Sequence, residues 1–248
     1  MLQNERYDKI LSQLQAKGAV KVAALAKDFS ISESTIRRDI IELDQMGKLR
    51  KVFGGAVSCD TYVTSEETDV KTRAAFSVDE KDSIAKYAAS LIEANDFVFM
   101  DAGTTTEKLI DFIPASTATF VTNGLTHALT LMRRGHKVYL LGGRLNASTE
   151  AVTGVEAVSG LAKYNFTKCF LGANGVDLEH GFTTPNVEEA MVKTHAARRS
   201  SMVVVLADSN KFETVAPVTF LDIGQAWIIT DKLEHIKYRD YTEIIEAE

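Results

Sequence analysis

The sequence predicts an α/β protein in which a small helical domain precedes a larger domain with a mostly parallel sheet. Three observations support this prediction. Residues 1–57 have the periodicity of short helices, the rest alternates apolar runs with helical patterns, and the charge is unevenly spread. Residues 1–57 carry 10 Lys and Arg against 7 Asp and Glu, whereas the remainder carries 18 against 27. We therefore expect domains at 1–57 and 71–248, joined by a polar linker at 58–70.

The composition is that of a globular protein without a metal or cofactor. With 248 residues, 45% hydrophobic and 25% charged, the chain is long enough for a sizeable core. Its two cysteines, Cys59 and Cys169, are far apart, and its five histidines have no ligand-like spacing. The first ten residues are already charged, and no apolar run reaches the roughly 18 residues that a membrane span needs. We expect a cytoplasmic protein with no membrane partner.

The first domain has three short helical patterns. The first helix has Asn4 as a plausible N-cap and ends at Gly18, and a second follows over 22–29. Residues 30–32 then make a tight connection to a third helix, for which Ser32 is a good N-cap. Three helices with a three-residue connection before the last are typical of a helix-turn-helix.

The third helix presents arginine away from its apolar stripe. Ile36, Ile40 and Leu43 form that stripe when residues are placed at about 100° each. Two arginines and two small hydroxyl residues lie opposite it or on its flanks. Small side chains let a helix approach a surface closely, and arginine recognises the edge of guanine. The predicted contacts of this helix in the major groove of DNA are Ser34, Thr35, Arg37 and Arg38.

A basic hairpin is predicted after Gly47, which ends the third helix. The run from Lys48 to Phe53 is basic and leads into Gly54 and Gly55, as in the wing of a winged helix-turn-helix. A solvated helix face is the alternative reading of the two arginines, but it does not explain the short connection or this basic run. We expect phosphate contacts from Lys48, Arg50 and Lys51.

These motifs resemble a known family. Residues 5–56 are similar to the N-terminal winged helix-turn-helix of the DeoR family of bacterial transcription regulators, through "VAALAKDFSISESTIRRDIIELDQMGKL" followed by "GGA". Phe53 stands where the family often has a histidine, which leaves the predicted fold unchanged. The resemblance implies that operator DNA is a partner.

The second domain alternates helical patterns with apolar strands, which predicts a mostly parallel sheet covered by helices on both faces. Its strands run into Gly-rich or polar loops. If the strands are parallel, these loops converge at their carboxyl ends, where ligands bind in open α/β sheets. The loops begin at Asp101, Thr122, Gly142, Gly172 and Asp208.

The loop "DAGTTTEKL" suits a phosphate group. Gly103 lets the backbone approach a ligand, and three threonines then begin a helix whose free N–H groups and dipole favour an anion. A strand-to-helix turn with a threonine N-cap needs no ligand, and this alternative stays open. Lys211 and Arg144 could supply positive charge, and Asn123 and Asp177 could bind sugar hydroxyls, although Asp177 could also form a turn.

The DeoR resemblance extends over this domain through "EKDSIAKYAASLI", "DAGTTT", "VTN", "LGG", "GANGVD" and "ADSNKF". It implies a fold similar to ribose-5-phosphate isomerases and an effector that is a phosphorylated sugar or a related metabolite. The resemblance places an acidic sugar contact at Asp177, a basic contact at Lys211 and a Gly-Gly-x match at Arg144. It places the phosphate loop at Asp101, Gly103, Thr104, Thr105 and Thr106.

The predicted function is a metabolite-sensing repressor that works as a homo-oligomer, either a dimer or a tetramer. One recognition helix covers only a few base pairs, so useful discrimination needs two half-sites. The rival reading is a sugar-phosphate isomerase in which Glu188, Glu189 or Asp177 moves a proton. An isomerase has no evident need for the basic helical domain, and we therefore predict that the chain is not an enzyme.

Overall fold

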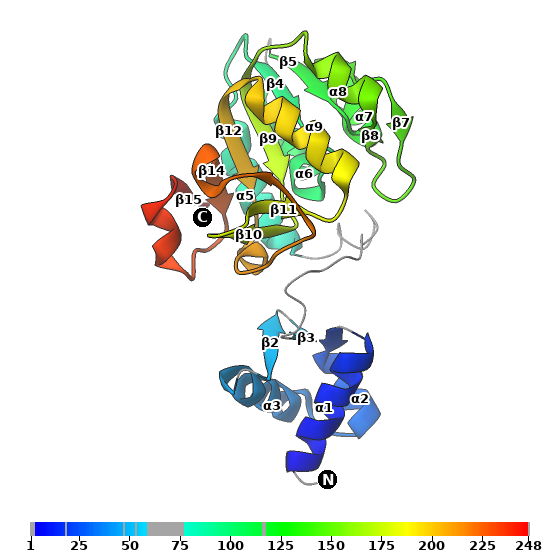
Figure 1. The fold of residues 1–248 in the computed structure, drawn as a ribbon, viewed down its shortest axis with the longest axis vertical. Helices are drawn as coiled ribbons and strands as arrows, with labels where there is room; N and C mark the ends of the chain where they lie inside the picture. Colours follow the sequence, from blue (N-terminus) through cyan, green and yellow to red (C-terminus); the bar gives the residue numbers. More distant parts are fainter. Residues whose placement is uncertain are drawn as a thin grey trace. The chain divides into compact units, whose positions relative to one another are not determined.

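The chain divides into two compact units, Met1–Tyr62 and Val63–Glu248, which we call the N-terminal unit and the C-terminal unit (Figure 1). Ser58, where the predicted linker starts, belongs to a strand of the N-terminal unit, and the rest of that linker lies outside the described residues. In the part of the chain that is described, no helix is both long and apolar enough to cross a membrane. The computed structural model describes residues 3–17, 19–46, 48–52, 54–58, 77–115 and 118–247.

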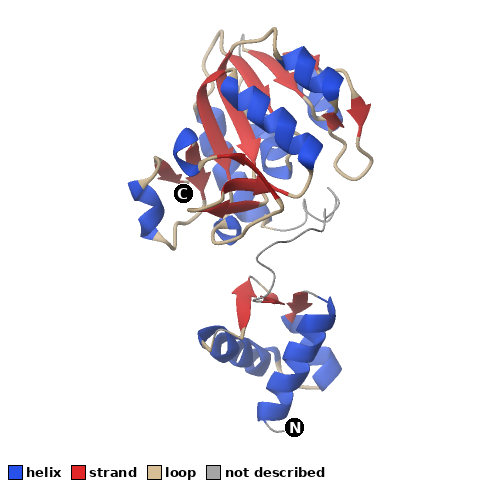
Figure 2. Ribbon diagram, in the orientation of Figure 1, coloured by secondary structure: helices blue, strands red, loops and turns tan. Residues whose placement is uncertain are grey.

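Three helices and a three-stranded antiparallel sheet make up the N-terminal unit (Figure 2). The three predicted helices are confirmed. The first begins at Gln3, however, so Asn4 lies inside this helix and is not its N-cap. Gly18 and Gly47, which were expected to end helices, lie outside the described residues. The elements are α1 (Gln3–Lys17), β1 (Ala19–Lys21), α2 (Val22–Phe29), α3 (Glu33–Gln45), β2 (Leu49–Val52) and β3 (Gly55–Ser58).

The connection between α2 and α3 has the three residues that the sequence predicts. Ser30 adopts a left-handed φ of 54° just after α2. Ser32 is the N-cap of α3, and its hydroxyl accepts a hydrogen bond of 3.3 Å from the Thr35 N–H. Ile36 and Ile40 are buried in the core of the unit. The apolar stripe of α3 therefore faces inward, and its opposite face is left for other contacts.

The predicted wing is a β-hairpin of β2 and β3. Gly54 in its turn has a φ of 77°, a conformation that favours glycine. β3 also pairs with β1, so the wing belongs to a sheet with the order β1-β3-β2. A Cβ atom on Gly55 would lie 2.0 Å from the Val20 carbonyl oxygen, and this close approach requires glycine. The sequence does not predict β1, because three residues are too few for an alternating pattern.

A seven-stranded sheet with the order β15-β14-β12-β9-β4-β5-β6 forms the centre of the C-terminal unit. All of its strand pairs are parallel, which confirms the prediction. The strands are β4 (Phe97–Met100), β5 (Thr119–Thr122), β6 (Lys137–Leu140), β9 (Phe166–Gly172), β12 (Ser200–Leu206), β14 (Trp227–Thr230) and β15 (Ile244–Glu246).

Helices cover both faces of this sheet, as predicted. Phe99 packs on the side of α8 and α9, whereas its neighbours Val98 and Met100 pack on the side of α5, α6 and α7. This alternation is the period of two of a β-strand. Figure 1 shows α9 in front of the sheet and α5 and α6 behind it. The helices are α5 (Val78–Ser90), α6 (Thr104–Phe112), α7 (Leu125–Arg133), α8 (Val155–Leu161) and α9 (Val187–Arg198).

Two smaller antiparallel pieces, which the sequence does not predict, complete the unit. One is a three-stranded sheet with the order β10-β11-β13, and the other is the ribbon β7-β8. Short 3₁₀ helices lie between the last strands. The remaining elements are β7 (Arg144–Leu145), β8 (Val152–Thr153), β10 (Gly175–Asp177), β11 (Gly181–Thr184), η1 (Ser209–Lys211), β13 (Val218–Leu221), η2 (Ile223–Gln225) and η3 (Ile236–Asp240).

Candidate functional site

The start of α3 presents polar side chains on its outer face. Ser34, Arg37 and Arg38 are exposed, and Thr35 is half-buried. Arg37 pairs with Glu33 one turn earlier, at 2.8 Å, through an exposed ion pair. Arg38 makes no hydrogen bond or ion pair within the described part of the chain. Of the two arginines, Arg38 therefore has its guanidinium available to an external acceptor.

A buried ion pair holds α3 against α1. The two carboxylate oxygens of Asp39 accept hydrogen bonds of 2.7 and 2.8 Å from the guanidinium of Arg6. Asp39 is 1% exposed, and this bidentate contact raises the pKa of Arg6. The sequence reading missed this pair. The available signal was the position of Asp39 between Ile36 and Leu43, inside the apolar stripe.

The wing is attached to α3 through its backbone. The Lys51 N–H donates a hydrogen bond of 2.8 Å to Asp44 Oδ1 near the end of α3. The side chains of Lys48 and Lys51 are exposed. Arg50 lies in β2, but its side chain is outside the described part of the structure. The wing thus has a fixed attachment to α3 while two of its basic side chains face solvent.

In the C-terminal unit, the predicted loops follow β12, β9, β4, β5 and β6, which are consecutive neighbours in the sheet. Because these strands are all parallel, their loops lie at the same edge, as the sequence predicts. Gly103 and Gly172 come close there: a Cβ atom on Gly172 would lie 3.8 Å from the Gly103 Cα atom. A Cβ atom on Gly124 would lie 3.2 Å from the Ala102 Cα atom. Small residues thus bring the backbones of three loops together.

Asp101 joins the loops at this edge of the sheet through buried hydrogen bonds. It is 1% exposed, and its Oδ1 atom accepts hydrogen bonds from the Gly103 N–H at 3.0 Å and the Thr106 hydroxyl at 2.8 Å. Its Oδ2 atom accepts from the Gly172 N–H at 2.8 Å and from the ammonium of Lys193 on α9. Burial works to raise the pKa of Asp101, but the charge of Lys193 and these hydrogen bonds lower it below its usual value. Both oxygens are therefore occupied by the protein itself.

The Lys193 side chain was missed by the sequence reading. It is 7% exposed and also donates a hydrogen bond of 2.9 Å to the Gly172 carbonyl oxygen, so it joins α9 to the loops after β4 and β9. A lysine within a helix has no sequence signal for such a role.

Thr106 and His127 complete the network below the loop. Burial lowers the pKa of His127, which keeps the ring neutral near pH 7. Its Nε2 atom lies 3.0 Å from the Gly103 carbonyl oxygen, which can only accept, so this nitrogen carries the proton. The Thr106 hydroxyl also lies 3.0 and 2.8 Å from the Asp101 and Gly103 carbonyl oxygens, so its single proton is directed inward whichever of these acceptors takes it. Thr106 is thus part of the support and is not presented outward.

The first turn of α6 is left without a side-chain cap. Its N-cap is Gly103, not a threonine as in the alternative reading, and the three threonines form the first turn. Thr104 and Thr105 are 8% and 7% exposed, and among the described residues their hydroxyls have no hydrogen-bond partner. Helix geometry provides no acceptor for the N–H groups of this turn. Uncapped N–H groups and a helix dipole together make an anion-binding site.

Asn123 lies beside this loop on the neighbouring strand. Thr122 pairs with Met100 across β5 and β4, so Asn123 follows next to Asp101. Its Nδ2 atom donates to the Val152 carbonyl oxygen at 3.2 Å. Its Oδ1 atom is buried and, within the described residues, accepts no hydrogen bond. Asn123 therefore has an acceptor to offer a ligand.

The other predicted contacts are placed differently. Asp177 Oδ1 accepts hydrogen bonds from the N–H groups of Glu179 and His180 at 3.0 and 2.9 Å, in the turn between β10 and β11. Arg144 on β7 is 71% exposed at its side chain and pairs with Glu188 at 2.6 Å. Lys211 ends η1 after β12, which lies two strands from β4, or about 10 Å. The structure thus groups Asp101, Gly103 and the threonines, places Asn123 beside them, and leaves these three contacts as predictions.

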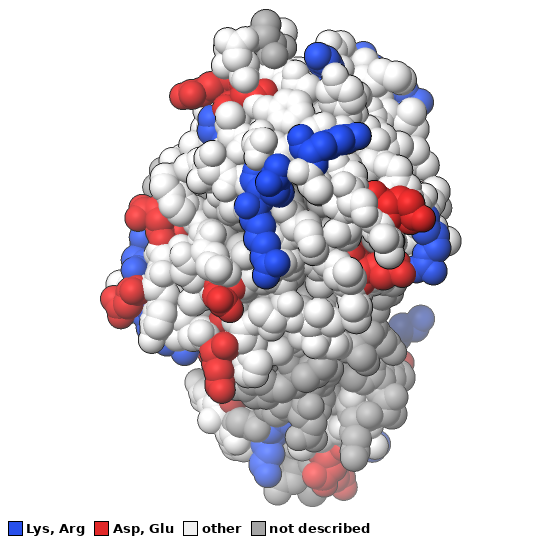
Figure 3. All heavy atoms as spheres, turned by 45° about the horizontal axis from the view of Figure 1, so that its top comes forward, with Lys and Arg blue, Asp and Glu red and all other residues white. Residues whose placement is uncertain are grey.

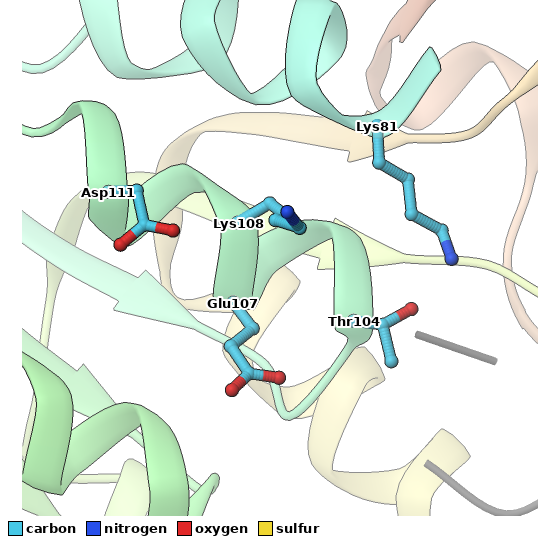
Figure 4. Close-up of a pocket in the computed structure, with 5 residues that line it drawn as sticks. All are labelled: Lys81, Thr104, Glu107, Lys108 and Asp111. Carbon is cyan, nitrogen blue, oxygen red and sulfur yellow. The ribbon is translucent and has the colours of Figure 1, made fainter. Parts of the chain in front are cut away.

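A pocket of about 200 Å³ opens beside the start of α6 (Figure 4). Among the described residues, its lining includes one predicted site residue, Thr104, together with Lys81, Glu107, Lys108 and Asp111.

Charge distinguishes the surfaces of the two units. Figure 3 shows basic side chains gathered near the middle of one face of the C-terminal unit, with acidic side chains around them. The excess of Lys and Arg belongs to residues 1–57. A surface that binds nucleic acid needs such a basic excess, which places the DNA contacts on the N-terminal unit.

Comparison with known proteins agrees with this division. Residues 6–62 match the family described as "DeoR-like helix-turn-helix domain", and residues 77–232 match the family described as "DeoR C terminal sensor domain". The chain belongs to the DeoR family of transcription regulators. Its N-terminal unit is the DNA-binding domain of such a regulator, its C-terminal unit is the sensor domain, and the family consists of regulators and not of enzymes.

Relatives of similar length carry regulatory names. The uncharacterized HTH-type transcriptional regulator FruR of Bacillus subtilis is 38% identical over 244 residues, which cover 98% of this chain and 96% of that protein. The lactose phosphotransferase system repressor of Staphylococcus aureus is 32% identical over 255 residues, 99% of this chain and 100% of that protein. The putative aga operon transcriptional repressor of Escherichia coli O157:H7 is 32% identical over 211 residues, 84% of this chain and 78% of that protein.

Among solved structures, the ribose 5-phosphate isomerase of Methanocaldococcus jannaschii matches with a TM-score of 0.42 and 15% identity. The match covers 54% of this chain and 54% of that one. A likeness at this level carries no inference about activity.

Proposed function

We propose that this DeoR-family regulator is a repressor of a sugar-metabolism operon and that a phosphorylated sugar, or a related metabolite, controls its binding to the operator. The observation that carries the proposal is the uncapped first turn of α6, where the hydroxyls of Thr104 and Thr105 have no hydrogen-bond partner among the described residues. Such a turn favours a dianionic phosphate, and an unphosphorylated sugar lacks this group.

On the DNA side, α3 enters the major groove, and Arg38 contacts a base edge, because its guanidinium has no partner among the described residues. The Arg37 guanidinium, paired with Glu33, contributes less. The proposed groove contacts are Ser34, Thr35, Arg37 and Arg38, and the proposed phosphate contacts of the wing are Lys48, Arg50 and Lys51.

On the effector side, Gly103, Thr104 and Thr105 bind the phosphate through N–H groups and hydroxyls. Asp101 and Thr106 position that loop, because their polar atoms are already bonded inside the protein. Asn123 offers its buried Oδ1 atom to a sugar hydroxyl. Further contacts from the surrounding loops are assigned to Arg144, Asp177 and Lys211.

The active form is a cytoplasmic homo-oligomer, a dimer or a tetramer, in which two copies of α3 bind two half-sites. A single helix reads only a few base pairs, and the discrimination that a genome requires comes from pairing half-sites. Light scattering of the protein bound to its operator tests this part, and a monomer that binds tightly would contradict it.

The test of the whole proposal uses an operator selected from random DNA with the full-length protein. Operator affinity is measured by fluorescence anisotropy with and without ribose 5-phosphate, fructose 1-phosphate, fructose 6-phosphate and glucose 6-phosphate. At least one of them should change the affinity, and the matching unphosphorylated sugars should not. An operator affinity that none of these compounds changes, or that free sugars change equally, would refute the assignment of the effector.

A further inference from the structure

The two edges of the seven-stranded sheet differ, and the edge at β15 is covered. The Glu243 carbonyl accepts a hydrogen bond from β14, so the next carbonyl, of Ile244, points outward. That oxygen accepts a hydrogen bond of 2.9 Å from Arg239, whose guanidinium also pairs with Glu246 at 2.7 Å. Arg239 belongs to η3, so a short helix and an ion pair occupy this edge. A covered and charged edge does not take up another strand.

β6 ends the sheet on the other side and leaves its edge open. Three of its four residues are exposed, and among the described strands only β5 pairs with it. The Leu141 N–H donates a hydrogen bond of 2.9 Å to the Thr122 carbonyl oxygen of β5. Because the direction of backbone groups alternates along a strand, Val138 and Leu140 point their N–H and C=O groups away from β5. Such a row of outward groups is a template for another strand.

Apolar side chains flank the open edge on both faces of the sheet. Tyr139 and Leu140 are each 42% exposed and point to opposite faces, as consecutive residues of a strand do. Tyr139 lies on the face of Tyr164, with 6.4 Å between the ring centroids. On the α7 face, Leu129 and Met132 are 39% and 56% exposed. Contiguous exposed apolar residues of this kind mark an interaction surface.

Leu129 and Met132 lie on the flank of α7 that faces the open edge. With about 100° per residue, they fall on one side of the buried Leu131, and Arg134, just after the helix, falls on the other. Arg134 is directed to α6, where it donates a hydrogen bond of 2.9 Å to the Asp111 carbonyl oxygen. Because α6 contacts β9 whereas α7 contacts β5 and β6, the flank opposite α6 faces outward beside β6.

We propose that β6 is a dimerisation edge, which pairs antiparallel with β6 of a second copy about a two-fold axis at Tyr139. This inference rests on the proposed homo-oligomer and assigns a surface to it. Addition of β6 to β15 of another copy is blocked by η3, so the open edge pairs with its own counterpart and forms a closed dimer instead of a fibre. Antiparallel pairing also separates the two copies of Lys137, whereas parallel pairing would place their charges side by side.

Val138 and Leu140 determine the register of this pairing. With the axis at Tyr139, Val138 of one copy lies opposite Leu140 of the other, so all outward N–H and C=O groups of β6 are paired. An axis at Val138 or at Leu140 would leave the other one opposite a residue outside β6. Stable dimers bury roughly 800 Å² per partner, whereas a four-residue strand is only about 13 Å long. The exposed Leu129 and Met132 of the two α7 helices extend the contact.

The first test measures the mass of the full-length protein by light scattering. Met132→Glu combined with Leu140→Asp places like charges near the axis and should halve the mass, from dimer to monomer or from tetramer to dimer. Ile236→Asp introduces a charge at an apolar position of η3 that is 77% exposed, and this control should keep the wild-type mass.

Cysteine cross-linking tests the register without removing the contact. A Cys59→Ser background retains one native cysteine, the buried Cys169. In it, Tyr139→Cys should form a disulfide between two copies with oxidised glutathione, because residues at the axis have Cα atoms about 4.5 Å apart. Lys137→Cys is the control and should stay reduced, since its two copies are about 13 Å apart, beyond the limit of about 7 Å.

The outcomes separate this surface from the proposed oligomer. A double variant that keeps the wild-type mass refutes β6 as the interface and leaves the oligomer standing. A Tyr139→Cys variant that stays reduced, or a disulfide at Lys137→Cys, refutes the pairing about Tyr139. If wild type is a monomer when bound to its operator, the proposed oligomer itself fails, and this inference fails with it.

Discussion

The starts of α3 and α6 show two uses of the same residue types at a helix N-terminus. Both begin with small hydroxyl side chains. In α3 these hydroxyls bond to one another: Ser32 lies 2.9 Å from the hydroxyls of Ser34 and Thr35 and caps the helix. In α6 the N-cap is Gly103, and within the described part of the chain the hydroxyls of Thr104 and Thr105 make no hydrogen bond. A helix start whose N–H groups are capped by its own side chains can present another side chain to a partner. A helix start with uncapped N–H groups can bind the partner directly.

Each start also has a buried aspartate behind it. Asp39 within α3 pairs with Arg6 of α1, and Asp101 just before α6 pairs with Lys193 of α9. In both units a cation from another helix fixes the carboxylate. The two sites therefore share a buried ion pair and differ in whether the first turn of the helix is capped.

The largest effect on stability is expected from breaking the ion pair between Lys193 and Asp101. Lys193→Met would leave Asp101 buried without its cation and should destabilise the C-terminal unit by about 3–5 kcal/mol. Trp227, the single tryptophan, lies in β14 of this unit, so its fluorescence during urea unfolding reports the change. Lys163→Met, at an exposed position of the same unit, is the control. An unchanged urea midpoint for Lys193→Met would mean that the pair does not hold the loop.

The same pair predicts a pH dependence. The folded state lowers the pKa of Asp101, so its contribution to stability is present above the unfolded pKa, about 3.9, and is lost as pH falls through the folded value. The free-energy difference between wild type and Lys193→Met should therefore shrink in acid. A difference that grows as the pH is lowered would contradict this sign.

The second effect concerns operator affinity and tests whether Arg38 on α3 contacts a base. Arg38→Ala should cost roughly 1–3 kcal/mol on the selected operator and relax base preference at one position. Arg37→Ala is the matched control and should cost less, because Glu33 already pairs with Arg37. Anisotropy titrations on operator and on unrelated DNA measure both. Equal losses on the two DNAs would make Arg38 a contact to the phosphate backbone.

The third effect concerns the open end of α6. Thr105→Val should weaken a bound sugar phosphate about tenfold, or about 1.4 kcal/mol, because a hydrogen bond to the charged phosphate is lost. Stability without ligand should be unchanged, since the Thr105 hydroxyl has no partner in the described protein. Thr106→Val, which removes inward hydrogen bonds, should instead lower the unfolding midpoint. Calorimetry and urea unfolding of both variants separate the two roles, and a reversed pattern would refute the assignment.

The smallest effect is expected from removing the side-chain cap at the start of α3. Ser32→Ala removes the N-cap and should cost about 1 kcal/mol of local stability. Hydrogen exchange of the α3 amides in the full-length protein measures it, with Ser34→Ala as a control that keeps the cap. If both variants exchange alike, the capping bond contributes nothing measurable.

Local patterns predict much of this fold. The helical period found α3 and its stripe, Ser32 was recognised as a cap, and alternating apolar and helical runs predicted the parallel sheet. These features depend on residues close together in the sequence. The β10-β11-β13 sheet depends on pairing between short strands, and Phe182 opposite Leu221 has no local signal.

The site was predicted less completely for the same reason. Gly103 and the threonines form one contiguous motif, so the open start of α6 is readable from the sequence. Lys81 and Lys193 resemble ordinary surface lysines of amphipathic helices, and only the fold buries them. Lys193 meets Asp101 across 92 positions of the chain. For Asp177 the sequence left a sugar contact and a turn former open. The structure shows its hydrogen bonds in the turn between β10 and β11, and the sugar contact stays a prediction.

The strand order of the large sheet has a consequence of its own. From β4 the chain proceeds outward through β5 and β6, whereas from β9 it proceeds the opposite way through β12, β14 and β15. At such a reversal, adjacent connections leave toward opposite faces and separate above the strand ends, which is where α/β proteins bind ligands. The position of a ligand site then follows from the strand order of the sheet, and the side chains around that site determine which ligand it binds. Substitutions along the rim can retune a sensor of this kind from one sugar to another without rebuilding its core.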